Sequence, residues 1–468
     1  MTVVERKALE LERKLDSLTS ELQRWREESE ESKPFEKHHS QIRRISSQLT
    51  GLQEALRAKL QGYAQAGTLL SACPQLEEDI LDLHCVWDFF RSKLALRAVP
   101  FFKKYLAAAD ELAWKCYKPA RSRAHAVGGQ ARPIKEPPLV FFDANSSPFA
   151  RFRLSAYESV GENRQRSTDT TGLPPLIQVL PIPLIGTPWF QAHHLSDALI
   201  LSHEVGHIVE DDFRLTSTLQ GLLGKAGVPD ERLPAWAAWL REVFADVYGC
   251  LALGPAFVSA LMDFLAAEPQ HITHQRLDAL RWGPYPTRFL RVLLNLQVVD
   301  AMGFKQEADK YRKGWRALYP QHAMDSGFEE DIPKVVGALL KGPYPEFGGV
   351  SLREVLCFSA EEQVAASQDA SRLLTPENPR SSNVRVLLAA ARLAYEQNPK
   401  AYAKNDAQLV VLTRIEQALE TGVRNSPQGQ GTQEAKALEK ADREAGAQLL
   451  GFLSSKGAYD PGPAEGSK

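Results

Sequence analysis

Two histidines four residues apart flank a glutamate in residues 202–207, which read SHEVGH. On an α-helix, residues four apart share a face, so His203 and His207 can direct two imidazoles at one metal ion. Glu204 would then project beside the ion, where its carboxylate can accept a proton from a metal-bound water. The apolar run before this segment favours a helix. The spacing therefore predicts two ligands and the general base of a catalytic zinc site.

A catalytic zinc ion usually has three protein ligands and one open position, so a third ligand must come from elsewhere in the chain. The best candidate is Glu242, on a predicted helix that has Pro234 near its first turn. Asp246 lies four residues later on the same face, where it can accept a hydrogen bond from the outward ring nitrogen of a ligand histidine. We expect one zinc ion per chain.

The segments HEVGH and EVFAD together resemble the gluzincin branch of zinc metallopeptidases, and the resemblance covers residues 138–302, about a third of the chain. It implies a zincin-like fold in which one helix carries HExxH and a second carries the glutamate ligand. It assigns His203, His207 and Glu242 as ligands, Glu204 as general base and Asp246 as the carboxylate that orients a ligand. It also implies an edge strand that holds an extended substrate, which we place at residues 176–180.

The sequence departs from the named families of this branch. Between His207 and Glu242 lie 34 residues, more than in thermolysin-like enzymes. The sequence has no aminopeptidase motif of the Gly-x-Met-Glu-Asn type, and no third histidine follows at the short spacing of the metzincins. We therefore assign the branch but no family.

Peptide hydrolysis produces an oxyanion that a tyrosine, histidine or arginine commonly stabilises. Tyr285 and Arg288 are our candidates, because they precede a predicted helix that can approach the zinc. The alternative is that Tyr285 packs in a proline-rich turn and that Arg288 forms a local ion pair. His193 and His194, just before the metal helix, are interpreted as surface residues or residues of its first turn.

The predicted fold is mainly α, with a small mixed or antiparallel β-sheet beside the zinc helices. Residues 1–70 form a helical arm in which apolar residues recur at steps of four and three. These residues are Leu11, Leu15, Leu18 and Leu22 before Pro34, and Ile42, Ile45, Leu49, Leu52, Leu56 and Leu60 after it. An antiparallel hairpin and a coiled-coil dimer both fit this pattern, as do a self-packing arm and a partner-binding arm.

Residues 71–350 are assigned to a zincin-like metallopeptidase domain. Residues 351–424 form a C-terminal helical region, and residues 425–468 a linker, a charged helix and a disordered tail. Strands are expected at residues 139–142 and 176–180, with a mobile loop at 155–172 between them. Helices are expected from about residue 191 onward, among them helices near 191–210 and 351–374.

The composition favours a cytoplasmic protein. The net charge of −2 gives no reason to expect nucleic acid as a partner. We find no secretory signal and no apolar run of the roughly 18 residues that a membrane span requires. The five cysteines form no CxxC pair, which is typical of reduced thiols.

The favoured function is a zinc-dependent peptide-bond hydrolase, an endopeptidase acting on peptide or protein substrates, in which Glu204 activates a zinc-bound water. Two alternatives remain. The chain is a zincin-fold scaffold without activity, or it is a helical adaptor whose coiled-coil arm binds a partner and whose HExxH is incidental. The residues do not distinguish endopeptidase, aminopeptidase and amide hydrolase.

Overall fold

The structure of the chain is a computed structural model that describes residues 1–30, 33–128, 135–153, 181–272, 277–278, 281–320, 326–375 and 377–421. These residues are mainly helical and include a small three-stranded sheet, so the expected fold class is confirmed at this level. The described chain forms two compact units. The first contains Met1–Ala98, and the second contains Val99–Phe152 and continues from Leu184.

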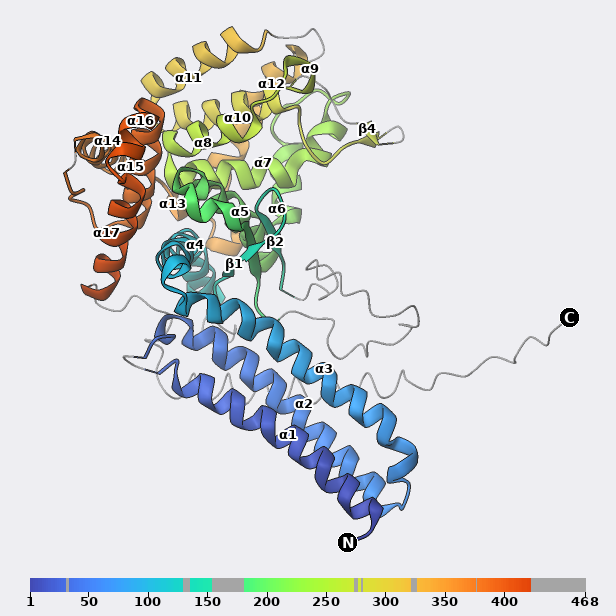
Figure 1. Cartoon of the computed structure of the whole chain (residues 1–468). Helices are drawn as coiled ribbons and strands as arrows, with labels where there is room; N and C mark the ends of the chain where they lie inside the picture. The colour runs from blue at the N-terminus through green and yellow to red at the C-terminus, as the bar shows by residue number, and fades with distance from the viewer. Residues whose placement is uncertain are drawn as a thin grey trace, which may run out of the picture. The chain divides into compact units, whose positions relative to one another are not determined.

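The first unit is an antiparallel three-helix bundle of α1 (Val3–Glu27), α2 (His39–Gln65) and α3 (Leu69–Ala95), which Figure 1 shows side by side. Four leucines of α1 are buried, namely Leu11, Leu15, Leu18 and Leu22. The Gln53 side chain of α2 donates a hydrogen bond to the Leu15 carbonyl. Lys7 and Lys14 of α1 both pair with Glu77 of α3. The two apolar seams thus pack within one chain, and the bundle extends past residue 70, where we expected the arm to end.

The sheet of the second unit follows the long helix α4 (Pro100–Gly128). Its central strand, β3 (Leu184–Pro188), pairs in parallel with β1 (Leu139–Asp143) and antiparallel with β2 (Phe149–Arg151). All five residues of β3 are buried. β1 matches the strand expected at 139–142, whereas β2 and β3 were not anticipated. The expected strand at 176–180 and loop at 155–172 lie outside the described residues.

Helices make up most of the remaining second unit (Figure 1). In chain order they are η6 (Trp189–His193), η7 (Leu195–Ile200), α5 (Leu201–Phe213), α6 (Thr216–Gly224), α7 (Leu233–Leu253), α8 (Pro255–Leu265), α9 (Pro269–Ile272), α10 (Arg288–Ala301), α11 (Lys305–Leu318), α12 (Ser326–Lys341), η8 (Pro345–Phe347), α13 (Leu352–Val355), α14 (Ala360–Leu374), α15 (Val384–Gln397), α16 (Pro399–Lys404) and α17 (Ala407–Thr421). A two-stranded ribbon, β4 (Leu277–Asp278) with β5 (Arg281–Trp282), precedes α10.

Two local differences from the expected helices have clear causes. The helix expected from residue 191 begins at Leu201, because two 3-10 turns, η6 and η7, occupy the preceding residues. The helix expected over 351–374 divides into α13 and α14, since Leu356 is extended and Ser359 starts α14 with a capping box. The described residues from 351 onward belong to the second unit, together with the predicted metal helices. Residues 425–468, predicted as a linker, charged helix and tail, lie outside the described chain.

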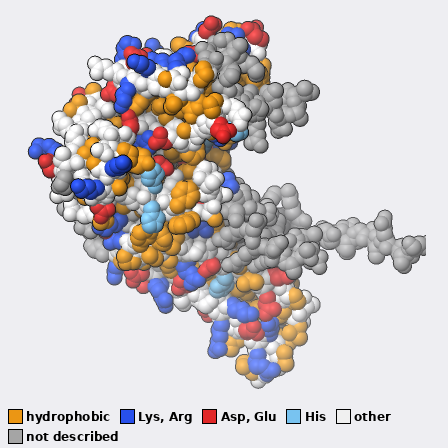
Figure 2. All heavy atoms as spheres, turned by 45° about the horizontal axis from the view of Figure 1, so that its top comes forward, with side chains coloured by type: hydrophobic (Ala, Val, Ile, Leu, Met, Phe, Trp, Pro, Cys, Tyr) orange, Lys and Arg blue, Asp and Glu red, His pale blue; other side chains and the backbone are white. Residues whose placement is uncertain are grey.

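The visible surface carries no large patch of one charge. Figure 2 shows basic and acidic side chains interspersed, with hydrophobic side chains between them. No described helix is both long enough and apolar enough to span a membrane. All five cysteines lie in the described residues as free thiols, three of them buried.

Candidate metal centre

Helices α5 and α7 carry the HExxH and ExxxD segments and pack closely together. Their contact depends on Gly206, which lies between the two histidines. A Cβ atom at Gly206 would lie only 2.8 Å from the backbone Cα of Ala245 on α7. Glycine in a helix interior lowers stability by about 1 kcal/mol relative to alanine. Here it allows the two helices, and so the ligands they carry, to approach.

This approach brings His203, His207 and Glu242 together. One potential ligand atom from each lies within 4.8 Å of the others. The Nε2 atoms of His203 and His207 lie 3.3 and 3.4 Å from the two carboxylate oxygens of Glu242. All three side chains are almost completely buried. The structure therefore brings together the three residues that the sequence predicted as ligands.

The polar atoms of this cluster fit a divalent cation. Glu242 Oε2 and His207 Nδ1 are buried, and neither has a hydrogen-bond partner among the described residues. A buried carboxylate oxygen that accepts no hydrogen bond is costly, and a cation between the three side chains would satisfy it. Two imidazoles and one carboxylate form the donor set of many catalytic zinc sites. The residues thus fit the expected zinc ion.

Asp246 lies behind His203, as predicted. Its Oδ1 is 2.8 Å from His203 Nδ1, a distance at which the carboxylate pairs with a protonated ring. On its other side, Arg291 of α10 donates two hydrogen bonds to the Asp246 carboxylate. Asp246 is 1% exposed. The carboxylate therefore holds the outward side of a ligand histidine, as is common in metal sites.

Burial and neighbouring charges shift the pKa values of the side chains in this cluster. Burial opposes a positive charge on His203, but Asp246 and Glu242 outweigh it and raise the pKa of His203 to about 10. Burial likewise opposes the Asp246 carboxylate, whereas Arg291 and His203 lower the pKa of Asp246 to about 2. Burial also opposes the charge on the Glu242 carboxylate. His203 and His207 outweigh burial and hold the pKa of Glu242 well below its ordinary value. Without metal, the cluster therefore retains a proton on His203.

An open pocket of about 320 Å³ adjoins the three ligands. Glu204, the predicted base, lines it and is 7% exposed. The edge strand β2 contributes Phe149 and Ala150 to its lining. The predicted base and the three predicted ligands thus line one open pocket.

Of the two oxyanion candidates, only Tyr285 lines this pocket. Its ring lies 5.5 Å from the Arg291 guanidinium, and burial raises its pKa. Arg288 is exposed in the first turn of α10, where its Nη1 donates to the Leu265 carbonyl. The structure therefore brings Tyr285 to the site and places Arg288 away from it.

Sequence reasoning missed Arg291, which lines the pocket one turn beyond Arg288. A usable signal was present, because Arg291 interrupts the apolar residues of α10 that follow the Thr287 N-cap. An arginine on the buried face of a helix needs a carboxylate partner. That partner is Asp246, which the sequence had already singled out.

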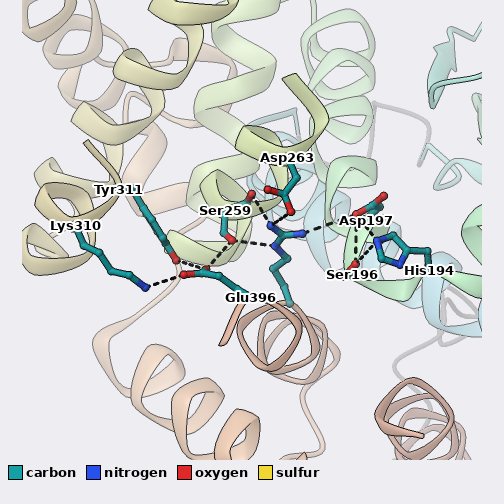
Figure 3. Close-up of polar contacts among 9 residues, drawn as sticks. His194, Ser196, Asp197, Ser259, Asp263, Lys310, Tyr311 and Glu396 are labelled. Carbon is teal, nitrogen blue, oxygen red and sulfur yellow. Dashed lines mark hydrogen bonds and ion pairs between the residues drawn. The ribbon is translucent and has the colours of Figure 1, made fainter. Parts of the chain in front are cut away.

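A polar network holds η7, the 3-10 turn that precedes α5. Figure 3 shows this network around His194 and Asp197. Arg392 of α15, 1% exposed, lies with its Nη1 3.9 Å from Asp197 and donates through Nη2 to Asp263 of α8. Neither His193 nor His194 lines the pocket. The network thus joins α15 and α8 to the turn before the metal helix.

The chain was compared with protein-family models, curated proteins and solved structures, and none of these comparisons found a match.

Proposed function

We propose that this protein is a zinc-dependent peptidase of the gluzincin type, with His203, His207 and Glu242 as ligands and Glu204 as general base. The observation that carries the proposal is the cluster itself. Two segments separated by 34 residues place their predicted ligand atoms within 4.8 Å of one another, beside a pocket that the predicted base also lines. If the HExxH sequence had arisen by chance, there would be no reason for the side chain of Glu242 to lie beside its two histidines.

Zinc, when bound, supplies a Lewis acid that makes a coordinated water acidic near neutral pH and polarises a carbonyl. Glu204 accepts the proton of the attacking water and returns it to the leaving amine. Asp246 keeps His203 oriented, with Nε2 toward Glu242. Tyr285 is positioned to donate a hydrogen bond to the oxyanion from its phenol.

The walls of the pocket are suited to a peptide. Apolar side chains of β2, η7 and α8 line it, namely Phe149, Ile200, Leu261 and Phe264. Such surfaces bury the side chains that flank a scissile bond, while the ligands and Glu204 act on the bond itself. In the gluzincin resemblance the substrate strand falls at residues 176–180, outside the described chain.

The direct test is hydrolysis of a proteome-derived peptide mixture by zinc-loaded protein, with cleavage products identified by mass spectrometry. Wild type is expected to cleave, and Glu204→Gln to lose at least about a hundredfold in rate with an unchanged zinc content. Glu231→Gln, an exposed glutamate outside the pocket, is the matched control and is expected to cleave like wild type. Zinc binding without any cleavage by wild type would contradict the peptidase proposal and leave a zinc-containing scaffold.

A further inference from the structure

Arg241 precedes the ligand Glu242 on α7 and lines the same pocket. Its side chain is 47% exposed. Two neighbours fix its position. The guanidinium carbon lies 4.3 Å from the centre of the Phe152 ring, and its Nε lies 3.5 Å from Glu210 Oε2. The arginine is thus held in place at the pocket wall.

The charge of Arg241 faces the pocket, whereas its counter-charge does not. Glu210 is 5% exposed, does not line the pocket, and accepts a hydrogen bond from Thr216 through its other oxygen. Among the described residues, Arg241 has no further acceptor on its two terminal nitrogens. The fork of the guanidinium is therefore available to a ligand.

The second arginine of the pocket has a different arrangement. Arg291 is 7% exposed and gives two hydrogen bonds to the buried Asp246. Its charge is therefore balanced within the protein. Among the described residues that line the pocket, Arg241 is therefore the cation that can pair with an incoming anion.

We infer that Arg241 binds a carboxylate of the substrate, which gives the enzyme a preference for peptides with an acidic group near the scissile bond. The inference rests on the proposed peptidase function. A planar guanidinium whose carbon lies over an aromatic ring can still use its nitrogens for a two-point contact with a carboxylate. Because Arg241 adjoins a metal ligand, that contact falls within a few residues of the cleaved bond. The carboxylate belongs either to an Asp or Glu side chain or to the substrate's C-terminus.

The test compares the cleavage sites of a random peptide library for zinc-loaded wild type and Arg241→Gln. Wild type is expected to favour a carboxylate at one fixed position by about ten- to a hundredfold, the value of a hydrogen-bonded charge pair. Arg241→Gln is expected to lose that preference, and Arg241→Glu to favour Lys or Arg there. Arg312→Gln, which changes an arginine of α11 paired with Asp309, is the control and should keep the wild-type pattern.

Two modified peptides identify the source of the carboxylate. If a Glu→Gln replacement in a good substrate lowers its cleavage rate by the same factor as the preference, the contact is to a side chain. If amidation of the substrate's C-terminus lowers the rate in this way, the contact is to the terminal carboxylate. Cleavage by wild type without any acidic preference, or a preference that survives in Arg241→Gln, overturns this inference alone. Absence of all cleavage by zinc-loaded wild type overturns the proposed function as well.

Discussion

Arg291 and Asp246 face each other between helices α10 and α7, joined by hydrogen bonds of 2.9 Å from Nε to Oδ2 and 2.7 Å from Nη2 to Oδ1. Asp246 in turn lies 2.8 Å from the ring of His203. One turn further along the same helices, the Cys250 thiol donates to the Asn295 side chain. The orientation of His203, the proposed metal ligand on α5, is therefore set from α10 through two buried charges.

Arg291→Met is expected to destabilise the protein by about 3–5 kcal/mol, because it leaves the buried Asp246 carboxylate without its cation. Zinc affinity should also fall, by about ten- to a hundredfold, since Asp246 no longer holds His203 in one orientation. Denaturant unfolding and zinc titration measure the two effects. Arg312→Met, at an exposed ion pair on α11, should change both by little. An unchanged stability in Arg291→Met would show that the pair is not buried as described.

Zinc binding should strengthen as pH rises. In the metal-free protein the pKa of His203 is raised from 6.5 to about 10, so zinc must displace a proton at neutral pH. The stability that this proton contributes is fully present below pH 6.5 and is lost as pH rises through 10. The apparent zinc affinity should gain roughly tenfold per pH unit for each displaced proton.

Competition with a chelator between pH 6.5 and 8.5 measures this slope. Asp246→Asn removes the charge that holds the proton on His203, so its slope should be shallower over the same range. Equal slopes in the two proteins would contradict the assigned contact between Asp246 and His203.

Gly206→Ala should destabilise the protein by about 1–3 kcal/mol, despite the higher helix propensity of alanine, because the added methyl meets the backbone of α7. Zinc affinity should fall with it, as the ligand helices move apart. Gly221→Ala in α6 is the matched control. Its Cβ would enter open space, and it should stabilise by about 0.5–1 kcal/mol. Thermal unfolding distinguishes the two, and a stabilising Gly206→Ala would contradict the close approach of α5 and α7.

Tyr285→Phe tests the oxyanion role. It should lower kcat by about a hundredfold, with the KM and zinc content little changed, because the phenol acts on charge that develops in the transition state. Arg288→Gln should leave kcat near the wild-type value, since Arg288 does not line the pocket. If steady-state kinetics instead showed a large loss of kcat in Arg288→Gln and little loss in Tyr285→Phe, the oxyanion role would belong to Arg288.

The sequence was most informative where chemistry imposes a fixed spacing. His203 and His207 share a helix face, as do Glu242 and Asp246. This spacing, together with the HExxH motif and the gluzincin resemblance, pointed to all four residues. The apolar residues of α1 and α2 likewise predicted two packed helices. Each of these patterns depends on the geometry of a single helix, so the sequence of one segment is enough to reveal it.

Other features depend on distant parts of the chain and were not predicted. Arg291 binds Asp246 across 45 residues. Arg288 was chosen because its segment precedes a predicted helix, and local sequence does not show which arginine of that helix reaches the pocket. The strand β2 has three residues, too few to show an alternating pattern. The inclusion of α3 in the first bundle required knowledge of which helices pack together. Such pairings are set by tertiary packing, not by local propensity.

The central claim, that His203, His207 and Glu242 bind one zinc ion, is tested most directly by the metal content of purified protein. Elemental analysis should compare wild type with His203→Ala and Glu204→Gln. About one zinc per chain is expected in wild type and Glu204→Gln, with a marked loss in His203→Ala. If wild type holds no zinc even after refilling with the metal, the claim is wrong and the cluster is not a zinc site.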